Sequence, residues 1–148
     1  MKAKDIMTRD VITVRTTTTI EEIARILTNH HVGGVPVVNN ERHVVGIVTE
    51  SDLFLNEKGL PFSAVKLPEL FKHWVDPSQI DEIYRNARHH TAADVMTESV
   101  LCVDAESDIG HVAWMMAQRD LKRIPVVSDN VLVGIITRAN LIRLLIQE

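Results

Sequence analysis

The chain has 148 residues, a formal net charge of −4 and a hydrophobic share of 45%. This length fits one compact unit or two small half-domains, with an aliphatic core because only 4% of the residues are aromatic. The acidic balance disfavours a nucleic-acid partner, which requires a basic surface. The single Cys102 excludes an internal disulfide and a cysteine-based metal site. Because the sequence shows neither a signal peptide nor an apolar run of membrane-spanning length, we expect a cytoplasmic protein with no membrane contact.

The two halves of the chain carry the same sequence pattern. Residues 5–8 (DIMT) recur 89 positions later as residues 94–97 (DVMT). Residues 45–49 (VGIVT) recur as residues 133–137 (VGIIT), at an offset that is one residue shorter. Ordered matches of this kind indicate an internal duplication.

Each copy predicts a strand, a helix, two strands and a second helix. In the first copy, residues 11–14 are the first predicted strand, and Thr19 and Glu22 form a capping box that begins the helix. Residues 34–38 predict a short buried strand, and residues 44–49 predict its neighbour across a turn. The last helix follows that strand directly.

The second copy repeats these elements, with Asp108 as the N-cap of its long helix. A strand, a helix and a strand imply a parallel pair with a right-handed crossover, and the following hairpin adds an antiparallel neighbour. A copy of about 50 residues is too small to be stable alone. We therefore expect an α/β fold in which two βαββα copies, residues 1–55 and 91–148, pack about a pseudo-twofold axis. Residues 56–90 are predicted to form an inserted helical connector.

The connector keeps helical spacing in two stretches. In the first stretch the apolar positions are Leu67, Leu70, Phe71 and Trp74. Residues 76–79 (DPSQ) then predict an N-cap, a proline at the first helical position and a glutamine at the third. The apolar positions of the second stretch are Ile80, Ile83, Tyr84 and Ala87. The connector is therefore predicted to hold two amphipathic helices with buried apolar faces.

A motif with binding chemistry follows the last strand of each copy. In the first copy, Thr49 ends the predicted strand and Asp52 lies in the first turn of the next helix. Thr137 and Asn140 stand at the same positions in the second copy, with an amide in place of the carboxylate. A carboxylate can accept hydrogen bonds from both hydroxyls of a ribose, and hydroxyl and free N–H groups suit a phosphate. The same residues also serve as ordinary helix caps. The recurrence of the motif in both copies favours the binding interpretation.

Two copies each of Asp-hydrophobic-Met-Thr, hydrophobic-Pro-Val-Val and Gly-hydrophobic-hydrophobic-Thr-x-x-Asp/Asn resemble the cystathionine β-synthase (CBS) domain pair, or Bateman module. The resemblance implies a regulatory module that is not an enzyme and carries no cofactor. It implies that AMP, ADP, ATP or a related adenosyl ligand binds in clefts between the two repeats. It also implies a homodimer and a separate regulated protein as partner.

The resemblance further implies two clefts, each shared by both repeats. Site A would comprise Thr49, Ser51, Asp52, Leu101, Arg119, Leu121, Lys122 and Arg123. Site B would comprise Thr137, Asn140, Ile12, His30, His31, Val32, Gly33 and Gly34. Apolar residues such as Leu101 and Leu121 would enclose the adenine, and the basic residues would meet the phosphate. Because Ala139 and Asn140 depart from the family pattern, we expect site A to bind more tightly.

Two other functions stay open. A ligand-free module for protein interaction or dimerisation would use the inserted helices as its surface, and a sensor of S-adenosylmethionine or of a dinucleotide would use the same clefts. Metal binding is disfavoured because the histidines at 30–31 and 89–90 are adjacent pairs, which point about 100° apart on a helix. Nucleophilic catalysis is disfavoured because Cys102 lies in a predicted strand and Ser51 has no base near it in the sequence.

Overall fold

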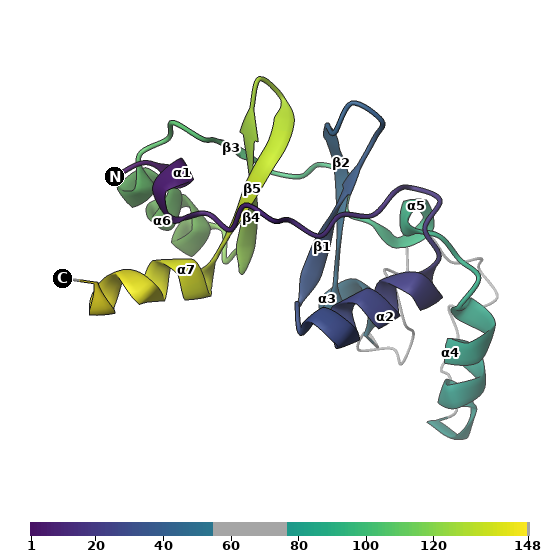
Figure 1. Cartoon of the computed structure of the whole chain (residues 1–148). Coiled ribbons are helices and arrows are strands. Elements are labelled where there is room, and N and C mark those ends of the chain that lie inside the picture. The colour runs from purple at the N-terminus through teal and green to yellow at the C-terminus, as the bar shows by residue number, and fades with distance from the viewer. Residues whose placement is uncertain (55–76, 148) are drawn as a thin grey trace. The chain divides into compact units, whose positions relative to one another are not determined.

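The computed structural model of the chain describes residues 1–54 and 77–147. It is a mixed α/β structure that divides into two compact units (Figure 1). Unit 1 comprises Met1–Ile12, Asn39–Val44 and Ser99–Glu148, and unit 2 comprises Thr13–Val38 and Val45–Glu98. Each unit draws on both halves of the sequence, so the compact units differ from the repeats along the chain.

The long helix of unit 2 is α2 (Ile20–His30), which begins after its N-cap Thr19. The Thr19 hydroxyl oxygen accepts a hydrogen bond from the Glu22 N–H at 3.2 Å, so the predicted N-cap is confirmed. Ile23 and Leu27 lie one turn apart and are buried in the core, with 0% and 8% of their surface exposed. This apolar stripe fixes which face of α2 packs on the sheet.

The sheet of unit 2 is formed by strands β1 (Gly34–Val38) and β2 (Val44–Thr49), and helix α3 (Glu50–Leu53) follows β2 directly. All five residues of β1 are buried. The strand predicted at 11–14 is reduced to a single parallel bridge between Val14 and Val37. A turn stops it there, because the Thr18 N–H donates to the Arg15 carbonyl at 3.1 Å.

Within the described residues, unit 2 also contains η3 (Pro77–Gln79), α4 (Ile80–Ala87) and α5 (Ala92–Val95). The second predicted connector helix is confirmed as α4, although residues 77–79 form a 3-10 turn before the α-helix begins at Ile80. The Tyr84 hydroxyl donates to the Leu53 carbonyl at 3.0 Å and so joins α4 to α3. The helix predicted over residues 67–74 and the N-cap at Asp76 lie outside the described residues.

The elements of unit 1 are α1 (Ala3–Ile6), β3 (Val103–Asp104), α6 (Ile109–Gln118), β4 (Arg123–Ser128), β5 (Val131–Thr137), α7 (Arg138–Ile142) and η4 (Arg143–Ile146). Strand β3 pairs with β4 in parallel, and β4 pairs with β5 antiparallel, so the predicted order of elements is confirmed. Asp108 caps α6 as predicted by accepting a hydrogen bond from the Gly110 N–H at 2.9 Å. The core is aliphatic, with Val112, Ile124 and Ile136 fully buried.

The opening segment of the first repeat packs within unit 1, against elements of the second repeat. Figure 1 shows α1, in purple, beside α6, and the Ala3 N–H donates to the Ser107 carbonyl at 2.8 Å. After α1, the Met7 side chain covers Gly134 of β5. Thr8 then forms an antiparallel bridge with Ile135.

Unit 2 shows the converse arrangement. After α5, the Met96 side chain covers Gly46 of β2. Thr97 and Ile47 exchange two backbone hydrogen bonds at 3.0 Å. Each unit therefore takes the opening segment of one repeat and the sheet of the other. The packing of the two repeats about a pseudo-twofold axis stays a prediction.

Candidate functional site

In unit 2, the motif lies where β2 ends and α3 begins. Thr49 is the N-cap of α3, and Asp52 lies in its first turn. The Asp52 Oδ2 atom accepts a hydrogen bond from the Thr49 N–H at 2.8 Å and another from the Thr49 hydroxyl at 3.3 Å. The cap thus holds the carboxylate in place at the edge of the sheet, with Ser51 exposed beside it.

The loop between α2 and β1 lies directly beside this motif. The Gly33 carbonyl accepts a hydrogen bond from the Glu50 N–H at 2.9 Å. His31, at the end of α2, has a left-handed φ of 52°, and the Val32 N–H donates back to the Leu27 carbonyl at 3.2 Å. The loop that sequence reasoning assigned to site B therefore adjoins the threonine motif that it assigned to site A.

In unit 1, Thr137 and Asn140 form the corresponding cap of α7. The Asn140 Oδ1 atom accepts from the Thr137 N–H at 2.8 Å and from the Thr137 hydroxyl at 2.9 Å. The Asn140 Nδ2 group donates to the Thr8 hydroxyl at 3.4 Å, and the residue is buried, with 7% of its surface exposed. Both ends of this amide are engaged in structural hydrogen bonds, so the cap interpretation accounts for Asn140.

The loop before β4 lies beside the Thr137 motif in the same way. The Lys122 carbonyl accepts a hydrogen bond from the Arg138 N–H at 3.1 Å, which is the equivalent of the Gly33–Glu50 bond. This loop is basic, because Arg119 and Lys122 are exposed and Arg123 is half-buried. The two units thus present loops of different charge on the same backbone arrangement.

Each of the two predicted clefts draws on both units. Unit 2 holds Thr49, Ser51 and Asp52 of site A and residues 30–34 of site B. Unit 1 holds the other predicted residues, which are Leu101, Arg119, Leu121, Lys122 and Arg123 of site A and Ile12, Thr137 and Asn140 of site B. The assembly of either complete cleft therefore stays a prediction, whereas the structure establishes neighbours within each unit.

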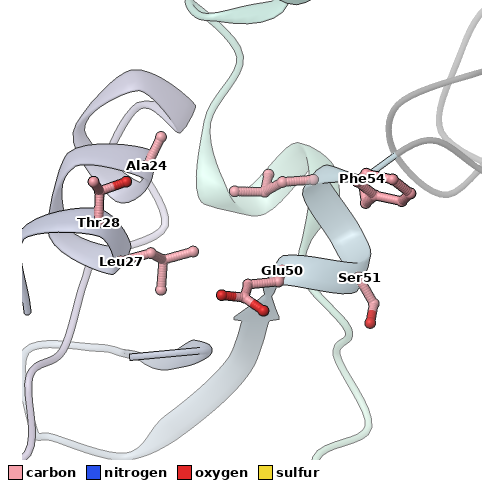
Figure 2. Close-up of a pocket in the computed structure, with 7 residues that line it drawn as sticks. Ala24, Leu27, Thr28, Glu50, Ser51 and Phe54 are labelled. Carbon is pink, nitrogen blue, oxygen red and sulfur yellow. The ribbon is translucent and has the colours of Figure 1, made fainter. Parts of the chain in front are cut away.

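A pocket of about 720 Å³ opens between α2 and α3 in unit 2 (Figure 2). Figure 2 shows the Leu27 and Glu50 side chains pointing toward each other across this pocket, and Ser51 is among its lining residues. The corresponding pocket of unit 1 lies between α6 and α7, has about 280 Å³, and includes Leu121 and Arg138 in its wall. Among the predicted site residues, Ser51 and Leu121 thus belong to the linings of these pockets.

Sequence reasoning missed one residue of the unit 1 site, Arg138. Its side chain contacts Asp120 and Leu121, in the loop that carries the predicted basic residues. The available signal was a difference between the repeats, because Arg138 occupies the position of Glu50 in the first copy.

Neither metal binding nor thiol chemistry gains support from the structure. Within residues 1–54 and 77–147, no three His, Cys, Asp or Glu side chains are placed to hold a metal ion. Cys102 is half-buried, and this burial raises the pKa of its thiol. A raised pKa keeps the thiol protonated at neutral pH, which makes it a poor nucleophile.

A duplicated α/β unit with the same cap motif in both copies defines a tandem-repeat module. The family model of the CBS domain matches residues 3–58 and residues 92–147. The chain therefore belongs to the CBS domain family, as a tandem pair of CBS repeats. None of the helices within the described residues has the length and apolar character needed to cross a bilayer.

Known proteins resemble the chain over nearly its whole length. The CBS domain-containing protein CBSX1, chloroplastic, of Arabidopsis thaliana is 29% identical over 93% of the chain, which spans 60% of that relative's length. The solved CBS domain of a CBS domain containing membrane protein from Sphaerobacter thermophilus is 35% identical, with a TM-score of 0.72 over 100% of this chain and 90% of that one. The solved CBS domain pair of protein MJ0100, in complex with 5'-methylthioadenosine and S-adenosyl-L-methionine, is 25% identical, with a TM-score of 0.70 over 98% and 95% of the two chains.

Proposed function

We propose that the chain is a regulatory module that binds an adenine nucleotide of the AMP, ADP or ATP type and acts on another protein. The observation that carries the proposal is the position of Thr49 and Asp52 next to the Gly33 loop in unit 2. A hydroxyl, a carboxylate and a glycine-containing backbone meet there within one unit. A carboxylate accepts strong hydrogen bonds from a ribose diol, because its charge strengthens each bond.

The basic loop of unit 1 supports the phosphate part of the proposal. Lys122 is exposed and adjoins the cap formed by Thr137 and Asn140 through its hydrogen bond with Arg138. Lysine and arginine side chains are the usual protein partners of phosphate groups. An anionic ligand would therefore meet local positive charge on a chain whose net charge is −4.

The neighbours within each unit suggest a grouping that differs from the predicted clefts. We propose that Thr49 and Asp52 act with residues 30–34 of unit 2, and that Thr137 and Asn140 act with residues 119–123 of unit 1. The Glu50–Gly33 and Arg138–Lys122 hydrogen bonds support this grouping. The MJ0100 structure supports the adenosyl class of ligand, because that CBS pair holds two adenosine derivatives.

Calorimetric titration of the full chain tests the proposal. AMP, ADP, ATP and S-adenosylmethionine are the ligands, and GMP is the matched control for the base. We expect at least one adenine ligand to bind, GMP to bind less tightly, and a ligand at 100 times its Kd to stabilise the chain by about 2.7 kcal/mol. If every adenine ligand fails to bind, the chain is instead a ligand-free interaction module.

A homodimer is a further part of the proposal and rests on exposed apolar residues of unit 1. Trp114, Ile142, Leu145 and Ile146 expose between 60% and 84% of their surface. Large exposed apolar side chains of this kind are typical of interfaces. Sedimentation equilibrium of the full chain should therefore report a dimer, and Leu145→Asp should shift it toward monomer. A monomeric wild-type chain at all accessible concentrations contradicts this part.

A further inference from the structure

The loop that joins α6 to β4 contains a residue with a left-handed backbone conformation. Asp120 has a left-handed φ of 52°, and the following Leu121 N–H donates back to the Met116 carbonyl at 2.9 Å. This conformation is common where a helix ends, and Asp adopts it more readily than most residues other than glycine. Leu121, Lys122 and Arg123 come next in the chain, so whatever holds Asp120 also sets where these side chains lie.

Arg138, the first residue of α7, contacts three consecutive residues of this loop. Its Nη2 group donates to the Asp120 Oδ1 atom at 2.7 Å, and its Nε group donates to the Leu121 carbonyl at 3.1 Å. Its backbone N–H donates to the Lys122 carbonyl at 3.1 Å. A planar guanidinium can hold a carboxylate and a carbonyl at the same time, which a lysine ammonium does less well.

The backbone contact matters more than the ion pair. The Asp120 side chain is 95% exposed and the Arg138 side chain 49% exposed, so solvent screens their attraction. Exposed ion pairs contribute little on average. The bond to the Leu121 carbonyl acts directly on the backbone that precedes Lys122, and therefore orients the loop whatever the ion pair contributes.

The equivalent positions in unit 2 cannot form the same contact. Glu50 stands at the position of Arg138, and His31 stands at the position of Asp120 with the same φ of 52°. The backbone bond from Glu50 to Gly33 is conserved between the units, at 2.9 Å. A glutamate at neutral pH accepts hydrogen bonds and cannot donate one to a carbonyl. The side-chain contact is therefore specific to unit 1.

We infer that Arg138 is a positioning residue for ligand binding, which holds the loop at 119–122 so that Lys122 and Arg123 meet the phosphate of a nucleotide. The inference rests on the nucleotide binding proposed above. It adds Arg138, which stands at a variable position of the Thr-x-x-Asp/Asn motif and acts on the ligand through the loop backbone. It also predicts that Arg138 affects recognition of the phosphate more than it affects recognition of the base.

The test combines calorimetry with hydrogen exchange on the full chain. Lys122→Ala first identifies the AMP-binding event that uses this loop. Arg138→Leu should raise the Kd of that event for AMP by roughly tenfold, the loss expected for a charge-assisted hydrogen bond. The Kd for adenosine, which lacks the phosphate, should change by less than about threefold, well under the tenfold step that a lost charged bond gives. Asp120→Asn, which removes the charge of the ion pair, tolerates the left-handed φ and keeps the Leu121 contact, should have a smaller effect than Arg138→Leu, and Arg138→Lys an intermediate one.

Glu50→Leu is the matched control, because it makes the equivalent substitution in unit 2, and it should leave the AMP Kd of this event unchanged. In the ligand-free chain, Arg138→Leu should accelerate exchange of the Leu121 amide, and Arg138→Gln replaces it if the leucine variant does not fold. Unchanged Leu121 exchange overturns the positioning role, and so does equal loss of AMP and adenosine affinity. If the wild-type chain binds no adenine ligand, the proposed function fails as well, and the exchange result still shows whether Arg138 holds the loop.

Discussion

The Met7 side chain lies directly on Gly134, so that a Cβ atom at position 134 would be 2.3 Å from the Met7 Sδ atom and 2.7 Å from its Cγ atom. Met96 and Gly46 repeat this relationship in unit 2, with 2.4 Å between the corresponding atoms. Met7 and Met96 are both buried, with 9% of their surface exposed. In each unit, a glycine in a strand thus leaves room for the side chain of a methionine from a segment that is distant in sequence.

Gly134→Ala should destabilise the chain by about 1–3 kcal/mol, the usual cost of overpacking a filled site. The added methyl group displaces Met7 as a whole, because the conflict reaches its Cγ atom and not just the end of the side chain. The measurement is urea unfolding followed by circular dichroism. Met7→Ala in the same chain should remove part of this cost, so the double variant should be more stable than the two single losses predict together.

Gly110→Ala is the control for the glycine substitution. A Cβ atom there would meet the Asp108 Oδ1 atom at 3.1 Å, so the Asp108 carboxylate has to shift only slightly, and no atom comes as close as the Met7 atoms come to position 134. Alanine is also favoured over glycine within a helix by about 1 kcal/mol.

If the stability losses of Met7→Ala and Gly134→Ala simply add in the double variant, this result would falsify the packing of Met7 on Gly134 as the cause.

Asp52→Ala should weaken AMP binding by roughly tenfold, whereas Asn140→Ala should weaken it less, because hydrogen bonds to charged groups are the stronger class. Stability should show the opposite order. Asn140 is buried and holds both Thr137 and Thr8, whereas Asp52 is half-buried. Calorimetry and urea unfolding of the two variants measure the two effects separately. A larger loss of AMP affinity in Asn140→Ala would show that the ligand site is assigned to the wrong motif.

Asp94 should make the chain sensitive to acid. The Thr91 backbone N–H and hydroxyl donate to its carboxylate, and His90 lies 3.5 Å away, so the pKa of Asp94 is lowered. A lowered pKa means that the stabilisation is complete above the pKa of the unfolded chain, near 3.8, and is lost as pH falls through the folded value. Unfolding midpoints measured between pH 7 and about pH 3 should therefore fall less steeply in Asp94→Asn than in the wild type.

Asp94→Asn is a mild change, because Asn140 shows that an amide can form the same cap in unit 1. Asp10→Asn is the matched control, since Asp10 is exposed, and it should leave the slope unchanged. Parallel pH profiles for the wild type and Asp94→Asn would contradict the prediction.

Cys102 should react slowly with thiol reagents in the folded chain. Burial raises the pKa of this thiol, so less thiolate is present at pH 8 than in a free cysteine. We expect the reaction with Ellman's reagent to be at least roughly tenfold slower than that of free cysteine, and to reach the free rate in urea. A folded chain that reacts as fast as the unfolded one contradicts this prediction.

The sequence predicted the features that depend on near neighbours. Thr19 and Asp108 cap their helices as expected, because an N-cap bond joins residues two or three positions apart. The exchange of opening segments could not be predicted, since the DIMT and DVMT segments fit either sheet equally well by pattern. The contact of Arg138 with Leu121 could not be predicted either, because it depends on how far a long side chain extends across the fold.

The candidate site shows the same division. Thr49 and Thr137 were predicted correctly at the ends of strands, and Asp52 and Asn140 in the first turns of the helices that follow. The Gly33–Glu50 and Lys122–Arg138 hydrogen bonds beside these positions were not predicted, because they follow from contacts between loops and helices within one unit. A resemblance in sequence relates residue identities, whereas the pairing of loops depends on contacts between segments that are distant in sequence.

The exchanged segments also set an order of events during synthesis. Unit 2 needs residues no later than Glu98, whereas unit 1 combines residues 1–12 with residues from the end of the chain. Thr8 and Asn140, which are 132 positions apart, meet in unit 1. A chain that folds as it leaves the ribosome can therefore complete unit 2 first. Met7 emerges early and stays unpacked until Gly134 has been synthesised. We expect a nascent chain arrested before β5 to leave its first residues accessible to protease and to any chaperone at the tunnel exit.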